Sequence, residues 1–144
     1  SSKPTIPLEE EIDYLKTYVS IENMRFNNLV AVEFRIDETV DTFTSVPTML
    51  LQPFVENVFV HAFNASHSNP KLLISFEIEN ETTLLCKIID NGKGLSKTSK
   101  SLHKSKGILL AKERLTLLDE TAEEAILVKE NIPNGVRVEV RLRF

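Results

Sequence analysis

The chain has 144 residues and a mass of 16.3 kDa, a length that suits one domain with a single core. Apolar residues make up 42% and charged residues 26%, which excludes a disordered tail and a coiled coil. Seventeen basic and twenty-one acidic residues give a net charge of 17 − 21 = −4, which argues against a surface built for nucleic acid. A single cysteine, Cys86, excludes an internal disulfide and a multi-cysteine metal site.

Hydrophobic periodicity predicts the elements of the first half. Residues 8–26 carry apolar side chains at three-to-four spacing with three glutamates near the start, which predicts an amphipathic helix. Residues 29–37 alternate between apolar and polar, as a half-buried strand does. Pro47 is expected to open a helical region that runs to about residue 63, with Pro53 at a kink or at the start of a second helix.

The second half is expected to form a hairpin, a lysine-rich loop, a helix and a second hairpin. These strands and this helix are expected at residues 71–79, 83–90, 107–118, 125–130 and 136–144. Asn80-Glu81 and Asn134-Gly135 supply the two turns. Because hairpins exclude a purely parallel sheet and each strand has one apolar face, we expect an α+β protein: a two-layer α/β sandwich whose mixed sheet is covered by helices on one face.

Glycine is scarce, and its distribution points to one segment. Three of the four glycines, Gly92, Gly94 and Gly107, bracket a stretch with five lysines and no Asp or Glu. Glycine lets a backbone approach a ligand closely, and lysine neutralises anions. The segment is therefore either part of an anion-binding site or a solvated loop.

Two polar residues stand where apolar ones are expected. The period of two places Asp90 on the buried face of its strand with Cys86 and Ile88, where it can accept a hydrogen bond from an amino group such as that of adenine. Asn57 and His61 share one helix stripe, and an amide oxygen is a suitable ligand for Mg²⁺. An ordinary turn after Asp90 and an interfacial polar stripe are the alternatives. The P-loop and the dinucleotide fingerprint are both missing.

Together these residues resemble the catalytic, ATP-binding part of a LytS-like sensor histidine kinase of the GHKL (Bergerat-fold) ATPase superfamily, in the form typical of Bacteroidetes members. Residues 52–57 with His61 resemble its N box, 90–94 its G1 box, 103–107 the end of its ATP lid and 134–138 its closing hairpin. The resemblance implies ATP and Mg²⁺ as cofactors, with Asn57 as the Mg²⁺ ligand and Asp90 at adenine. The positions it implies for nucleotide binding are Asn57, His61, Asp90, Gly92, Lys93, Gly94, Lys104, Lys106 and Gly107.

The resemblance also implies a division of the chain and a reaction. Residues 1–27 would be the end of the kinase dimerisation segment, either pairing between chains or packing on their own domain, and residues 28–144 the ATP-binding domain. The enzyme would be a protein-histidine kinase that transfers the γ-phosphoryl group to a His on an upstream segment, with no catalytic residue assigned within this sequence. It implies a homodimer, a response regulator as partner, and a cytoplasmic domain of an inner-membrane sensor, joined to the membrane through upstream segments alone.

Several positions depart from the resemblance. Val60, Ser105 and Leu110 stand where many relatives have Lys, Gly and Asn, which keeps open a degenerate, non-catalytic nucleotide-binding or protein-docking module. Pro53 stands where hydrolases of the superfamily have a general-base Glu, which favours a kinase over a hydrolase.

Overall fold

The structure is a computed structural model that describes residues 4–63, 67–94, 109–110, 113 and 125–144. Its elements are β1 (Thr5–Pro7), α1 (Leu8–Met24), β2 (Ala31–Ile36), β3 (Ser45–Pro47), α2 (Gln52–Asn57), the π-helical segment η1 (Val58–Ala62), β4 (Lys71–Asn80), β5 (Thr83–Asp90), β6 (Ile126–Glu130) and β7 (Val136–Arg143). Most of the helix expected at 107–118 lies outside the described residues, although residues 109, 110 and 113 are helical.

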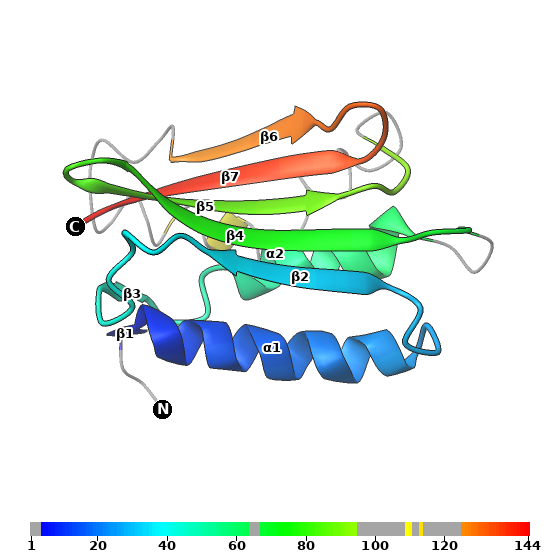
Figure 1. Cartoon of the computed structure of the whole chain (residues 1–144), viewed down its shortest axis with the longest axis horizontal. Coiled ribbons are helices and arrows are strands. Elements are labelled where there is room, and N and C mark those ends of the chain that lie inside the picture. Colours follow the sequence, from blue (N-terminus) through cyan, green and yellow to red (C-terminus); the bar gives the residue numbers. More distant parts are fainter. Residues whose placement is uncertain (1–3, 64–66, 95–108, 111–112, 114–124) are drawn as a thin grey trace.

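Five strands form one mixed sheet in the order β2-β4-β5-β7-β6 (Figure 1). β2 runs parallel to β4, whereas the other three neighbouring pairs are antiparallel. A parallel pair needs a crossover connection, and the segment that contains β3, α2 and η1 supplies it. Helices cover one face of this sheet, so the predicted two-layer sandwich is confirmed.

One core lies between the sheet and the helices. Every second residue of the central strands faces it, as the period of two requires. The most deeply buried of these strand residues are Leu72, Ile74, Phe76, Leu84, Cys86, Ile88 and Val140. Leu8, Ile12, Leu15 and Val19 of α1 are buried in the same cluster. α1 therefore packs on its own domain, while the assignment of residues 1–27 to a dimerisation segment stays a prediction.

The predicted start of the second helix is wrong. Residues 45–47 form β3, which pairs antiparallel with β1 in a separate two-stranded sheet. Met49 has a φ of 59°, which breaks the chain direction before α2 begins at Gln52. Pro53 lies in the first turn of α2, where a missing N–H removes no helical hydrogen bond. Residues 45–47 form a strand because they pair with β1, which lies far away in the sequence. Local hydrophobic periodicity does not reveal such a pairing.

The side chain of Asn23, near the end of α1, is hydrogen-bonded to the backbone of Val30, the residue before β2. The amide of Asn23 donates from Nδ2 to the Val30 carbonyl at 2.9 Å and accepts from the Val30 N–H at 3.1 Å. Val30 is 3% exposed, so no solvent replaces these bonds. We expect Asn23→Ala to lower the free energy of unfolding by about 1 to 3 kcal/mol, the cost of unsatisfied buried groups.

Urea unfolding of Asn23→Ala beside Ser20→Ala, an exposed position on the same helix, tests this expectation. Ser20→Ala should stay within about 0.5 kcal/mol of the unsubstituted chain. Equal stabilities for the two variants would show that the Asn23 bonds contribute nothing.

Candidate functional site

Asn57 ends α2 with its side chain turned inward. The residue is 7% exposed, and its Nδ2 donates a hydrogen bond to the carbonyl of Pro53 at 2.7 Å. This bond orients the amide, so Oδ1 is the atom available to a ligand. Helical geometry changes directly after Asn57, because η1 follows as a π-helix, a form that often marks functional sites.

Asp90 is the last residue of β5 and is 4% exposed. Its Oδ1 accepts the backbone N–H groups of Gly92 at 2.8 Å and Val136 at 3.2 Å. Both bonds use the same oxygen, and within the described part of the chain Oδ2 accepts none. The carboxyl is therefore held in place by backbone donors and keeps one oxygen for a ligand.

The protonation of Asp90 is shifted by its surroundings. Burial raises its pKa, and the hydrogen bonds from Gly92 and Val136 and the nearby His67 act in the opposite direction. Burial dominates, so the pKa lies above its ordinary value. A buried carboxyl with a raised pKa that lines a pocket is typical of functional sites.

Two glycines let three segments meet around Asp90. A Cβ on Gly92 would lie 2.2 Å from the carbonyl oxygen of Ala62, the last residue of η1, and the N–H of Lys93 donates to that oxygen at 3.0 Å. A Cβ on Gly135 would lie 1.9 Å from the backbone oxygen of Asp90. The end of η1, the segment after β5 and the turn before β7 are thus in backbone contact.

Asn57 and Asp90 line one pocket, although they lie on different layers. Its lining residues are Phe54, Asn57, Val58, Ile88, Asp90, Val136 and Val138. The cavity measures about 10 Å³, room for about one water molecule. Apolar walls with two convergent polar groups are the usual construction of a ligand site. A purine is larger than this space, so the pocket by itself does not hold a whole nucleotide.

The other predicted site residues stand around this pocket or outside the described chain. His61 is half-buried on η1, Lys93 is exposed after β5, and Gly94 has a φ of 87° beside Gly135; none of the three lines the pocket. Gly92 supports the site through its contact with Ala62. Lys104, Lys106 and Gly107 lie outside the described residues, as does Ser105.

Sequence reasoning missed a group of residues that hold the Asp90 loop. Asn69 donates its backbone N–H to Nδ1 of His67 at 3.2 Å, so we assign the proton to Nε2, which lies 2.9 Å from the Asn91 carbonyl. The Asn91 side chain accepts the Lys71 N–H at 2.7 Å and donates to Asn69. Asn131 donates to the backbone oxygen of Asp90 at 3.1 Å. No spacing in the sequence links these residues.

Asn57 is the predicted Mg²⁺ ligand, and two observations test whether the residues around it suit a metal ion. In the described ranges there is no group of three or more His, Cys, Asp or Glu side chains placed to hold a metal ion. The amide oxygen of Asn57 nevertheless fits Mg²⁺, which prefers oxygen ligands and keeps waters and substrate phosphates around it. A site of this kind needs few protein ligands.

No helix among the described residues is long and apolar enough to cross a bilayer.

The sequence matches curated sensor kinases, but no protein-family model matches it. It is 29% identical over 139 residues to the sensor protein LytS of Enterococcus faecalis, covering 91% of this chain and 23% of that protein. It is 30% identical over 92 residues to the sensor protein kinase HptS of Staphylococcus aureus, covering 64% of this chain and 17% of that protein. The chain thus spans less than a quarter of these relatives.

The fold matches solved histidine kinase structures. The histidine kinase AdeS of Acinetobacter baumannii has a TM-score of 0.68 at 14% identity, over 96% of this chain and 66% of that one. The catalytic domain of histidine kinase ThkA has a TM-score of 0.67 at 15% identity, over 96% and 93%. ThkA in complex with the response regulator protein TrrA has a TM-score of 0.61 at 18% identity, over 96% and 41%. The predicted resemblance is confirmed: the chain is similar in sequence to LytS and HptS sensor kinases, and it has the fold of a histidine kinase catalytic domain.

Proposed function

We propose that this chain is the ATP-binding catalytic domain of a bacterial two-component sensor histidine kinase, which binds Mg-ATP and passes the γ-phosphoryl group to a His on an upstream segment. The observation that carries the proposal is the meeting of Asn57 and Asp90 in one apolar-walled pocket. Similarity to sensor kinases supports it at the level of the fold and the family.

Each polar group has a role in this proposal. The unused Oδ2 of Asp90 accepts the exocyclic amino group of adenine, while guanine would present an oxygen acceptor there. Oδ1 of Asn57 binds Mg²⁺, which when present neutralises charge on the phosphates. His61, Lys93 and Gly94 contact the phosphates together with the lid positions at 104, 106 and 107. Positioning and charge neutralisation suffice for phosphoryl transfer, so no covalent residue is needed.

The assembly follows from the same proposal. Two copies dimerise through the segment that residues 1–27 complete, and residues 28–144 bind the nucleotide. A response regulator receives the phosphoryl group, which the complex of ThkA with TrrA supports by analogy of fold. The domain works on the cytoplasmic side of an inner-membrane sensor.

A second candidate function is a non-catalytic docking module. It is favoured by the size of the pocket, about 10 Å³, and by Val60, which is 54% exposed on η1 where many relatives have Lys. In this case the pocket would stay closed, and conformation rather than chemistry would regulate a partner.

Thermal unfolding with Mg-ATP, Mg-GTP or no nucleotide separates the two candidates. At one hundred times its Kd a ligand adds about 2.7 kcal/mol, which raises Tm by roughly 5 to 10 °C at this chain length. We expect that rise with ATP and none with GTP. No rise at millimolar ATP would contradict the kinase proposal and favour the docking module.

Removal of the Asn57 amide isolates its role at the metal. We expect Asn57→Ala to lose the gain in ATP affinity that Mg²⁺ provides, while it still prefers ATP to GTP through Asp90. Isothermal titration of both proteins with ATP, in Mg²⁺ and in EDTA, measures the difference. An unchanged Mg²⁺ effect in the variant would rule out Asn57 as the ligand, and unfolding without nucleotide controls for the lost bond to Pro53.

A further inference from the structure

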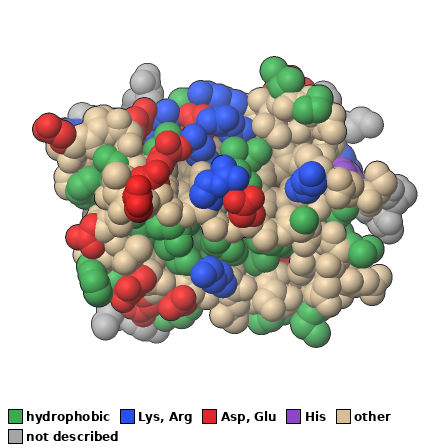
Figure 2. Space-filling model, viewed as in Figure 1, with side chains coloured by type: hydrophobic (Ala, Val, Ile, Leu, Met, Phe, Trp, Pro, Cys, Tyr) green, Lys and Arg blue, Asp and Glu red, His purple; other side chains and the backbone are tan. Residues whose placement is uncertain are grey.

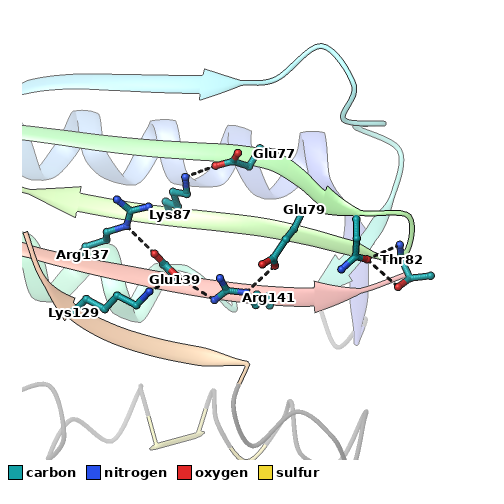
Figure 3. A network of polar contacts seen from close by, with 9 residues as sticks. Glu77, Glu79, Thr82, Lys87, Lys129, Arg137, Glu139 and Arg141 are labelled. Carbon is teal, nitrogen blue, oxygen red and sulfur yellow. Dashed lines mark hydrogen bonds and ion pairs between the residues drawn. The ribbon is translucent and has the colours of Figure 1, made fainter.

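Strand β5 fixes the place of the Asp90 backbone. It pairs with β4 on one side and with β7 on the other, and the pairing with β4 continues as far as Asp90. On the face of the sheet away from the helices, Lys87 of β5 contacts Glu77 of β4, and Glu139 of β7 binds three cations (Figure 3). Figure 2 shows acidic and basic side chains intermixed over this face. The sheet therefore places the Cα of Asp90, but it does not decide where the carboxyl group points.

A single peptide group after β5 orients that carboxyl. The group that joins Asn91 to Gly92 carries the Gly92 N–H, which donates to Oδ1 of Asp90 at 2.8 Å. The same group carries the Asn91 carbonyl, which lies 2.9 Å from Nε2 of His67. A trans peptide group is planar, with its N–H and C=O on opposite sides. His67 and Asp90 are therefore bonded to the two ends of one rigid unit.

Rotation of this peptide group would release the carboxyl. Glycine accepts most backbone angles, so Gly92 itself offers little resistance to the rotation. A rotated group would turn the Gly92 N–H away from Asp90 and present a carbonyl oxygen to the carboxylate, acceptor against acceptor. The bond from His67 opposes the rotation, because a rotated Asn91 carbonyl points away from the imidazole.

The imidazole of His67 is itself held on two sides. Nδ1 accepts the N–H of Asn69 at 3.2 Å, which assigns the ring proton to Nε2 and makes Nε2 the donor to the Asn91 carbonyl. The ring lies edge to face with the ring of Phe63, at 5.3 Å between centroids and 76° between planes. Phe63 directly follows η1, so His67 connects the end of η1 with the loop after β5.

Other bonds to Asn91 leave this task to His67. The side chain of Asn91 accepts the N–H of Lys71 at 2.7 Å and donates to the carbonyl of Asn69 at 2.8 Å. The N–H of Asn91 donates to the carbonyl of Lys71 at 3.3 Å. These bonds fix the side chain and the N–H of Asn91, whereas its carbonyl is held by His67.

We propose that His67 is a positioning residue for base recognition. Its bond to the Asn91 carbonyl sets the peptide group before Gly92, and this group keeps Oδ1 of Asp90 engaged and Oδ2 turned toward the adenine amino group. The inference rests on the proposed nucleotide site. Loss of the bond lets the Asp90 carboxyl rotate, so the distinction between adenine and guanine weakens while the Mg²⁺ site at Asn57 is unaffected.

Two substitutions separate the hydrogen bond from the packing of the ring. His67→Gln keeps an N–H donor near the position of Nε2, whereas the shorter amide of His67→Asn can replace Nδ1 alone. Both variants lose the ring contact with Phe63. In the chain without nucleotide, we expect hydrogen exchange of the Gly92 amide to be about tenfold faster in His67→Asn and within about twofold of the unsubstituted chain in His67→Gln. Exchange of the Cys86 amide, in the middle of β5, corrects for changes in global stability.

Nucleotide affinity gives a second measurement, which a loss of stability alone would not change. Isothermal titration with Mg-ATP and Mg-GTP should show the ratio of the two affinities lowered about tenfold in His67→Asn and within about twofold of the unsubstituted chain in His67→Gln. The gain in ATP affinity from Mg²⁺ over EDTA should be the same in all three proteins. The imidazole ¹⁵N signals of the unsubstituted chain should place the proton on Nε2.

The outcomes separate this inference from the nucleotide proposal. An unchanged Gly92 amide in His67→Asn, equal changes in both variants, or a neutral ring with its proton on Nδ1 would each overturn the hold of His67 on Asp90. A faster Gly92 exchange with an unchanged affinity ratio would overturn the link to base recognition. If the unsubstituted chain binds no nucleotide, the nucleotide proposal fails, and the Gly92 amide still decides whether His67 holds Asp90.

Discussion

Asp90→Asn is expected to stabilise the domain at neutral pH and to abolish its preference for adenine nucleotides. Asp90 has a raised pKa because it is buried, so folding favours its protonated form. Its contribution to stability is complete below the ordinary pKa of Asp and is lost as pH rises through the raised pKa of the folded state. Asn is neutral at every pH, and its Oδ1 can accept the same bonds from Gly92 and Val136.

We expect the free energy of unfolding to rise by about 0.5 to 2 kcal/mol at pH 7, a gain typical of changes that relieve a strained functional site. The gain should shrink toward zero as pH falls below about 4, where Asp90 is protonated in both states. Urea unfolding from acid to neutral pH measures it, with Asp13→Asn at an exposed position of α1 as the control. A variant that is less stable at pH 7, or a gain that does not change with pH, would contradict the assignment.

Nucleotide binding should change in the opposite direction. The amide introduced by Asp90→Asn places an N–H group where the carboxylate offered an oxygen, so it meets the adenine amino group donor to donor. One unsatisfied buried group corresponds to a loss of about 1 to 3 kcal/mol, or roughly 10- to 100-fold in ATP affinity. The same amide matches the guanine oxygen, so discrimination against GTP should fall. Unchanged ATP affinity would exclude Asp90 as the reader of the base, whatever the stability result.

Gly135→Ala is expected to be the most destabilising single-methyl change in the described chain, at about 3 to 5 kcal/mol. Its Cβ would lie 1.9 Å from the backbone oxygen of Asp90 and 2.8 Å from Cα of Asn91. Both are backbone atoms that no rotamer change can move. The φ of 104° adds strain for any residue with a Cβ.

Two other glycines separate these causes. Gly94 has a φ of 87° but its nearest neighbours are 3.8 Å from a Cβ, so Gly94→Ala carries strain alone, about 1 to 2 kcal/mol. Gly92→Ala carries overlap with the Ala62 carbonyl without a left-handed φ. Urea unfolding of the three variants ranks them, and we expect Gly135→Ala to lose most. Equal losses at Gly135 and Gly94 would mean that the hairpin moves away from Asp90 without cost.

The placement of Asp90 and Asn57 on their elements could be predicted from the sequence. The alternation in residues 83–90 puts Asp90 on the buried face because successive strand residues point to opposite sides, a property of the local backbone alone. The helix at Asn57 was likewise predicted, although its start was placed too early, at Pro47. Boundaries of the five predicted strands, which form the large sheet, agree within a few residues for the same reason.

The structure was needed wherever residues far apart in the chain meet. Pairing of β1 with β3 turned the expected helix start at Pro47 into a strand, and the contact of Gly135 with Asp90 follows from the antiparallel pairing of β5 with β7. Arg35, Ser75 and Lys87 are neighbours because β2, β4 and β5 align them in register. Hydrophobic periodicity is a property of neighbouring residues, so it can be read from the sequence. Strand register and backbone contacts between distant residues depend on the packing of the whole domain, so only the tertiary structure decided these.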